Sequence, residues 1–239
     1  MSYAKEFYAT RNEETVYAAR RVCSILIEKI PSICSAVDIG CGVGTWLSVL
    51  QEMGVKDIQG IDGSWVDQNM LVIPKDNFLE DDLTKAKKIT RRFDLAVCLE
   101  VAEHLPRECA NDFIRWLTEL SDIVLFSAAI PFQGGVNHMN EAWHSYWIEL
   151  FGANDYHLYD FIRARIWNDS QIPFWYRQNI ILFVKTNSCH KLNYEGVGHL
   201  PIDIVHPELF LSKCKQQPVS SSFLRRLVNV INRTFKSVN

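Results

Sequence analysis

Residues 37–45, near the start of the chain, contain three alternating glycines between a β-rich run and a helical pattern. Glycine lets the backbone turn tightly and approach a ligand, because no Cβ stands in the way. Asp62 ends the next β-rich run, where its carboxylate can accept hydrogen bonds from ribose hydroxyls. The pattern predicts that a nucleotide-like ligand binds over Gly40, Gly42 and Gly44.

Two details of this segment indicate which nucleotide it binds. The spacing is Gly-x-Gly-x-Gly, whereas dinucleotide-binding folds use Gly-x-Gly-x-x-Gly. Asp38 stands just before the turn, and its carboxylate suits a ligand that has an ammonium group and no pyrophosphate. S-adenosylmethionine has these properties and NAD does not. We therefore expect S-adenosylmethionine as the cofactor.

A second group of residues could perform acid–base or metal chemistry. Glu100, Glu103 and His104 follow one β-rich run, and His138 lies in the loop after the next. Histidine titrates near neutral pH, so His104 and His138, with Glu141 next, are candidate bases for a hydroxyl acceptor. A divalent ion such as Mn or Zn is the alternative, with Glu100, Glu103, His104 and His138 as its ligands. A purely structural role for each histidine stays open.

Strands and helices alternate along the part of the chain that carries these residues. The alternation predicts a parallel sheet with helical crossovers, and hence a doubly wound α/β fold. The expected strands are 36–39, 57–61, 77–80, 93–99 and 123–127. The expected helices are 16–30, 45–53, 84–90, 105–120 and 143–151.

The alternation changes after the fifth expected strand. Strands are expected at 157–166 and 179–185 with no helix between them, and strands joined only by a loop pair antiparallel. The prediction is a Rossmann-like, seven-stranded sheet whose last strand is antiparallel. The expected organisation is an N-terminal helical segment (1–34), a core (35–186) and a C-terminal appendage (187–239).

Composition limits the classes of protein that the chain can belong to. Of its 239 residues, 48% are hydrophobic and 22% are charged, which allows a full core and excludes general disorder. The net charge of −3 gives no reason to expect DNA as a partner. The seven cysteines form no Cys-x-x-Cys pair, and the first residues show no signal-peptide pattern. We therefore expect a cytoplasmic protein with reduced thiols.

The order of the motifs resembles that of class I S-adenosylmethionine-dependent methyltransferases. The resemblance rests on 38–44, Asp62, 81–83 and 93–105, and it covers about residues 35–186. It implies that Asp38 and the glycines hold the methionine end, that Asp62 holds the ribose, and that Asp81 or Asp82 meets the adenine. The cofactor-binding residues that it implies are Asp38, Gly40, Gly42, Gly44, Asp62, Asp81, Asp82 and Glu100. For Asp81 and Asp82 the alternative is an acidic helix start before Thr84.

The acceptor should lie beyond the carboxyl ends of the parallel strands, as ligands of doubly wound sheets do. That places 100–104, 128–141, 167–178 and the start of the last strand around it. Their aromatic, amide and imidazole groups suit a sugar, a glycan or another polyhydroxylated small molecule. Trp147 is expected in the core and Trp175 at the site. The full candidate set is His104, His138, Asn140, Glu141, Trp143, His144, Tyr146, Trp147, Trp175, Tyr176, Gln178 and Asn179.

The Glu100-x-x-Glu103-His104 pattern also resembles that of small-RNA 2′-O-methyltransferases and of some ubiquinone-pathway O-methyltransferases. That resemblance implies a divalent ion that orients the acceptor hydroxyls. Metal-free relatives share the Glu-His pair, so a histidine base without metal stays open.

Residues 220–237 have the pattern of a basic amphipathic helix, which could contact a membrane surface or a protein partner, or pack on the core. The sequence as a whole predicts an enzyme that O-methylates a polyhydroxylated acceptor. Another small molecule or an RNA 3′ end is the alternative acceptor. A cofactor-binding or scaffold protein without turnover is the alternative from another class, which the complete set of glycine and acidic positions disfavours.

Overall fold

The computed structural model describes residues 2–85, 91–193 and 201–216, with side chains from residue 13 to residue 215 in these ranges. The chain divides into two units, Met1–Ile204 and Val205–Asn239. In the part described, the second unit contains the helix α7 (Pro207–Gln216). The predicted helix at 220–237 lies outside the described residues.

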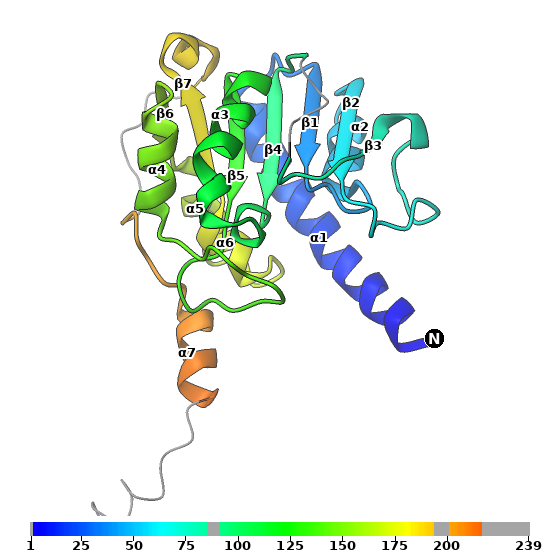
Figure 1. Ribbon diagram of the computed structural model, residues 1–239, viewed down its shortest axis with the longest axis vertical. Helices are drawn as coiled ribbons and strands as arrows, with labels where there is room; N and C mark the ends of the chain where they lie inside the picture. Colours follow the sequence, from blue (N-terminus) through cyan, green and yellow to red (C-terminus); the bar gives the residue numbers. More distant parts are fainter. Residues whose placement is uncertain (1, 86–90, 194–200, 217–239) are drawn as a thin grey trace, which may run out of the picture. The chain divides into compact units, whose positions relative to one another are not determined.

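Seven strands of the first unit form one mixed sheet, in the order β3-β2-β1-β4-β5-β7-β6 (Figure 1). β7 runs antiparallel to both β5 and β6, and the other neighbours are parallel. The predicted α/β sheet with an antiparallel last strand is therefore confirmed. The strands are β1 (Ser35–Ile39), β2 (Asp57–Asp62), β3 (Phe78–Glu80), β4 (Leu95–Leu99), β5 (Ile123–Ser127), β6 (Tyr156–Tyr159) and β7 (Ile181–Lys185).

Burial of the strands follows their position in the sheet. Every residue of β4 and of β5 is buried, because helices cover both faces of the central strands. The edge strands β3 and β6 are only partly buried. The expected strands with the most continuous apolar sequence, β4 and β5, therefore lie in the centre of the sheet.

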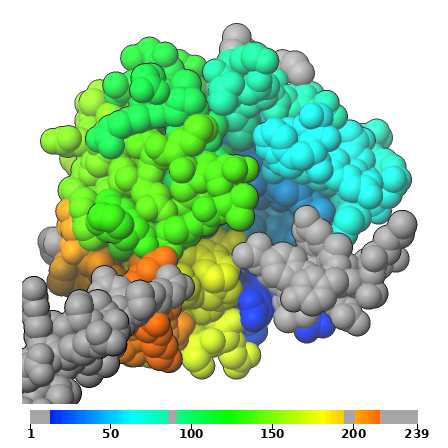
Figure 2. Space-filling view, turned by 60° about the horizontal axis from the view of Figure 1, so that its bottom comes forward, coloured from blue at the N-terminus to red at the C-terminus, as the bar shows by residue number. Residues whose placement is uncertain are grey.

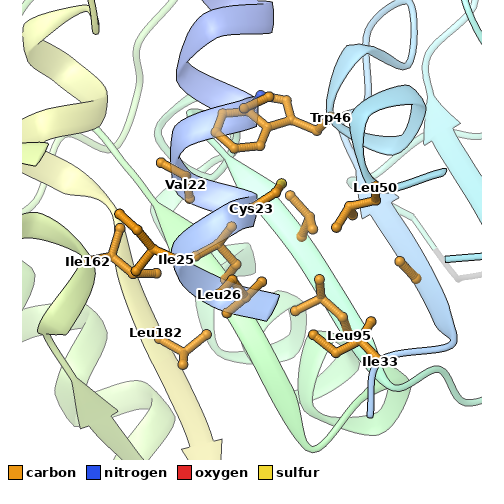
Figure 3. Close-up of a cluster of buried hydrophobic side chains, with 14 of the residues drawn as sticks. Val22, Cys23, Ile25, Leu26, Ile33, Trp46, Leu50, Leu95, Ile162 and Leu182 are labelled. Carbon is orange, nitrogen blue, oxygen red and sulfur yellow. The ribbon is translucent and has the colours of Figure 1, made fainter. Parts of the chain in front are cut away.

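One face of the sheet is covered by α1 (Ser2–Lys29), α2 (Thr45–Glu52) and α5 (Phe161–Ile166). Figure 3 shows their side chains meeting over the strands, with Leu26 from α1 and Trp46 from α2 above Leu95 and Leu182. The amino-terminal helix is therefore an integral layer of the core.

The other face is covered by α3 (Ala110–Leu120) and α4 (His144–Gly152). Phe151 of α4 stacks on Phe183 of β7, with 3.8 Å between the ring centroids. Trp147 of α4 is 1% exposed and packs against Phe126, which confirms its predicted place in the core. The two layers of helices complete the doubly wound arrangement.

The expected strand at 157–166 is wrong beyond Tyr159, because Phe161–Ile166 forms α5. Asp160 and Arg163 are completely buried and paired, and side chains three residues apart meet on a helix but not along a strand. A further helix, α6 (Phe174–Asn179), begins after Pro173 within the expected loop. β6 and β7 are nevertheless antiparallel neighbours, as predicted.

Other expected helices differ at their ends. The helix expected from residue 105 begins at Ala110, because Pro106 and a short 3-10 turn precede it. Thr84 and Lys85 form a turn, and the rest of the expected helix at 84–90 lies outside the described residues. The 3-10 turns are Lys75–Asn77, Ala102–His104, Arg107–Cys109 and Thr186–Lys191.

Among the described residues, no helix combines the length and the apolar character needed to cross a membrane.

His144, the first residue of α4, couples the stability of this fold to pH. It is 2% exposed, and burial, followed by the charge of Arg163, lowers the pKa of its imidazole to about 3. Below about pH 6.5 the unfolded chain binds a proton there and the folded chain does not. This group therefore leaves stability intact above pH 6.5 and reduces it as the pH falls towards 3.

We predict that His144→Gln removes this contribution. Relative to the unmutated protein, the free energy of unfolding of the variant should increase by up to ~1.4 kcal/mol for each pH unit below 6.5. Urea unfolding of both proteins at pH 7, 6 and 5 measures the difference. A difference that stays constant over this range would contradict the prediction.

Candidate functional site

The turn between β1 and α2 holds its three glycines in left-handed backbone conformations, with φ of 77° at Gly40, 54° at Gly42 and 89° at Gly44. A Cβ at Gly40 would lie 2.3 Å from Val101, and one at Gly44 would lie 2.7 Å from Ile73. A Cβ at Gly42 would meet nothing within 4 Å. The backbone at Gly42 is therefore open to a ligand.

Asp62, at the end of β2, fastens this turn to the neighbouring strand. Its carboxylate accepts the backbone N–H of Gly42 at 2.6 Å and that of Gly63 at 2.7 Å. Burial raises its pKa, and hydrogen bonds from these amides and the Trp65 side chain oppose the rise. Asp62, which is expected to bind the ribose, thus also holds the glycine turn in place.

A pocket of about 230 Å³ opens over the turn. Asp38 lines it, is 2% exposed, and has a carboxylate oxygen without a hydrogen-bond partner. Burial, followed by the charge of Asp62, raises the pKa of Asp38 well above its usual range. A buried, unpartnered carboxylate favours a cationic ligand group. Together with the open space at Gly42, it fits the ammonium end of S-adenosylmethionine.

Asp81 and Asp82, expected near the adenine, differ in their surroundings. Asp81 is buried, and its N–H donates to the carbonyl of Asp62 at 2.9 Å. The Asp82 carboxylate binds Thr84 and the Lys85 ammonium, which lower its pKa. Neither residue lines the pocket over the glycine turn. Asp82 is thus engaged in a local turn with Thr84 and Lys85, whereas Asp81 lies next to Asp62.

Glu100 directly follows β4 and has a left-handed backbone conformation, with φ of 56°. Its carboxylate accepts a hydrogen bond from Gln133 at 3.1 Å and another from Asn179 at 3.1 Å. The side chain of Gln178 donates to both Gln133 and Asn179. Burial raises the pKa of Glu100, and these amides oppose the rise. The network joins β4, the loop after β5 and α6.

Gln133 was not among the residues that the sequence singled out, although Gln178 and Asn179 were. Its position directly after an apolar run, in the loop expected to face the acceptor, was the available signal.

A larger pocket of about 540 Å³ adjoins the first, because Thr15, Leu99 and Tyr176 line both. Figure 2 shows the face of the molecule where the green segment after β5 and the yellow segment of α6 lie side by side. No pattern in the sequence indicated that α1 lines both pockets through Thr15. The remaining lining residues are Glu14, Glu100, Glu103, His104, Gln133, Gly134, Gly135, Val136, His138, Pro173, Phe174 and Trp175.

Three of the expected metal ligands meet in this pocket. Ligand atoms of Glu103, His104 and His138 all lie within 4.8 Å of one another. Glu103 is 0% exposed with neither carboxylate oxygen hydrogen-bonded, and burial, followed by the charge of Glu100, raises its pKa to about 9. Burial, followed by the electrostatic interaction with His138, lowers the pKa of His104. Glu100, the fourth expected ligand, has both oxygens bound by amides.

The His138 ring is held from two sides. Its Nδ1 lies 2.9 Å from the Glu141 carboxylate, which also accepts the N–H groups of Phe132 at 2.8 Å and Gly134 at 2.7 Å. A Cβ at Gly135 would lie 2.1 Å from Nε2 of His138. Glu141 therefore orients His138 rather than standing free, and Nε2 is the ring nitrogen left for chemistry.

The rest of the expected acceptor set is divided. Asn140 and His144 are buried and do not line the larger pocket. Trp143 and Tyr146 line a separate hollow of about 300 Å³, where the guanidinium of Arg107 lies 4.5 Å from the Tyr146 ring centroid. Trp175 and Tyr176 line the larger pocket.

Comparison with known families and structures agrees with this arrangement. A family model described as a methyltransferase domain matches residues 11–165, which include the glycine turn, Asp62 and the cluster around Glu103. No curated protein matches the chain.

Solved structures share the fold at low sequence identity. Magnesium protoporphyrin IX methyltransferase from Synechocystis PCC 6803, with bound SAH, is 18% identical over 74% of this chain and 86% of that one, with a TM-score of 0.53. DesVI of Streptomyces venezuelae is 12% identical over 76% and 96%, with a TM-score of 0.55. The small RNA methyltransferase HEN1 is 18% identical over 70% and 25%, with a TM-score of 0.52.

Asp38→Asn should have opposite effects on stability and on ligand binding. The amide removes a buried carboxylate that has an unpartnered oxygen, so we expect thermal unfolding to show a gain of ~1–3 kcal/mol. Calorimetry should show S-adenosylhomocysteine binding ~10–100-fold more weakly, because a hydrogen bond to a charged group is lost. Unchanged affinity in the variant would show that Asp38 does not face the ligand.

Proposed function

The chain belongs to the family of class I S-adenosylmethionine-dependent methyltransferase domains, and on that premise we propose that it methylates a hydroxyl of a sugar, a glycan or another polyhydroxylated acceptor. The observation that carries the proposal is the larger pocket, which adjoins the one lined by Asp38 and is itself lined by the oriented imidazole of His138 and by aromatic side chains. When bound, S-adenosylmethionine supplies an electrophilic methyl group.

Residues of the smaller pocket, together with the neighbouring Asp62 and Asp81, would hold the cofactor. Asp38 and the turn at Gly40, Gly42 and Gly44 would bind the methionine end. Asp62 would accept hydrogen bonds from the ribose, and Asp81 beside it would meet the adenine. The unpartnered oxygen of Asp38 and the open backbone at Gly42 support the first of these roles.

Residues of the larger pocket would orient the acceptor and remove its proton. Trp175 and Tyr176 offer faces on which the C–H side of a sugar ring can stack. Nε2 of His138 would accept the hydroxyl proton, because Glu141 holds Nδ1. His104, in contact with His138, is the second candidate base. Glu141 is then a positioning residue rather than a base.

Labelled-methyl transfer to a panel of sugars, other small molecules and RNA tests the proposal directly. Transfer to RNA alone would support the alternative acceptor, for which the fold shared with the small RNA methyltransferase is the support. Binding of S-adenosylhomocysteine without transfer to any class would favour the non-catalytic alternative.

Replacing His138 by Ala should lower kcat by ~10²–10⁴ if it removes the proton. Glu141→Gln should lower kcat less, because the imidazole remains but loses its charged partner. Neither change should alter the affinity for S-adenosylhomocysteine, since the cofactor pocket is lined by other residues. Full activity of His138→Ala and of His104→Ala on the true acceptor would exclude both bases.

Gly135→Ala tests the same ring without removing a polar group, because its Cβ would displace the His138 imidazole. Gly152→Ala is the matched control, since a Cβ there meets nothing within 4 Å. We expect the first variant, and not the second, to lose activity.

A divalent ion is the second candidate for activating the hydroxyl. The supporting observation is the unpartnered carboxylate of Glu103 within reach of His104 and His138. An ion there would lower the pKa of the bound hydroxyl, and Glu141 would orient the ligand His138 from behind. Glu103 fits better than Glu100 as the carboxylate ligand, because amides already bind both oxygens of Glu100.

If an ion binds there, a chelator should abolish activity and Mn or another divalent ion should restore it. Glu103→Gln should lose metal binding by elemental analysis, whereas Glu100→Gln should keep it. S-adenosylhomocysteine affinity should persist throughout, because the cofactor pocket shares none of the three ligands. If the metal-free protein keeps full activity in excess chelator, a histidine and not a metal ion activates the hydroxyl.

A further inference from the structure

The loop after β5 carries large apolar side chains that face solvent beside the acceptor pocket. Phe132 is 84% exposed, Val136 is 81% exposed and Met139 is 60% exposed. Val136 also lines the pocket, next to Gly134 and Gly135. Single exposed apolar residues are ordinary, but three in one short loop at the edge of a pocket indicate a contact surface.

The loop is fixed in this exposed form. Phe132 has φ of 67°, a left-handed conformation that bulky residues rarely adopt, and its N–H is held by the Glu141 carboxylate. Gln133, 8% exposed, is tied to Glu100 and Asn179. Strain at a site of this kind persists only where the surroundings impose it, and it points to a function for the presented side chain.

The pocket beside this loop is lined by both polar and apolar side chains. Glu103, His104 and His138 form the polar part, and Phe174 and Trp175 of α6 add aromatic surface. We propose that the acceptor is amphipathic, with a hydroxylated part that reaches His138 and a hydrocarbon part that covers Phe132, Val136 and Met139. This inference rests on the proposed function and specifies its substrate class.

The acceptor itself explains the loop better than a membrane surface does. Val136 belongs to both the exposed set and the pocket lining, so the apolar surface continues into the pocket. A hydroxyl placed at His138 brings its own substituents to this surface. Residues 131–143 also contain no Lys or Arg, whereas segments that bind anionic bilayers are rich in them.

The test compares methyl and octyl β-glucosides and β-galactosides, below the micelle concentration, by calorimetry on the protein saturated with S-adenosylhomocysteine. Each methylene that leaves water should tighten binding by about fourfold (~0.8 kcal/mol). We expect octyl glycosides to bind the unmutated protein ~60-fold more tightly than methyl glycosides, which corresponds to three covered methylenes.

Phe132→Asn and Met139→Gln should together reduce this preference at least tenfold. Asn tolerates the left-handed conformation, and Gln has nearly the shape of Met, so the loop should keep its backbone. Met70→Gln, at a methionine that is 43% exposed and lies outside the loop, is the matched control and should keep the preference.

Equal affinities for the two chain lengths, including no binding of either, would overturn the inference. An unchanged preference in the double variant would do the same. Vesicle binding that the double variant loses, without a preference among soluble glycosides, would assign the loop to a membrane instead. Chain-length-dependent binding without methyl transfer to any acceptor of the panel above would refute the proposed function and leave the amphipathic binding site standing.

Discussion

The larger pocket of this molecule depends on the hydrogen bonds made by one partly buried carboxylate, that of Glu100, which lines it. Each of its oxygens accepts an amide N–H, from Gln133 and from Asn179. These two partners lie 33 and 79 residues away from Glu100 in the sequence. Gln178 closes the network, so any movement of one segment would leave buried amides without partners. The backbone of Glu100 is left-handed, and its N–H donates to Ser127 of β5.

The glycine turn and its place beside Asp62 could be predicted from sequence because their determinants are local. Asp38 and the three glycines lie within seven residues of one another, 38–44, and only a glycine-rich turn satisfies both the backbone conformation and the contact with Val101. Asp62 is on the adjacent parallel strand, whose register follows from the alternation of strands and helices. Periodicity and spacing were therefore sufficient there.

The larger pocket is formed by contacts between residues far apart in the sequence, which a local sequence pattern cannot predict. Thr15 lines both pockets because α1 packs on the sheet. The helical pattern in the sequence did not indicate where on the sheet this helix packs. The strand expected at 157–166 was wrong because a buried ion pair, Asp160 with Arg163, stabilises helix where the apolar residues also fit a strand. Glu141 had the residue type of a base, and only the observed N–H donors of its neighbours identify it as a support for His138.

The wall shared by the two pockets couples what each of them binds. Thr15, Leu99 and Tyr176 border both cavities, so a molecule in the smaller one would change the surface that a molecule in the larger one meets. A molecule in the larger cavity would in turn change the fit of a molecule in the smaller one, because coupling between two binding sites is reciprocal.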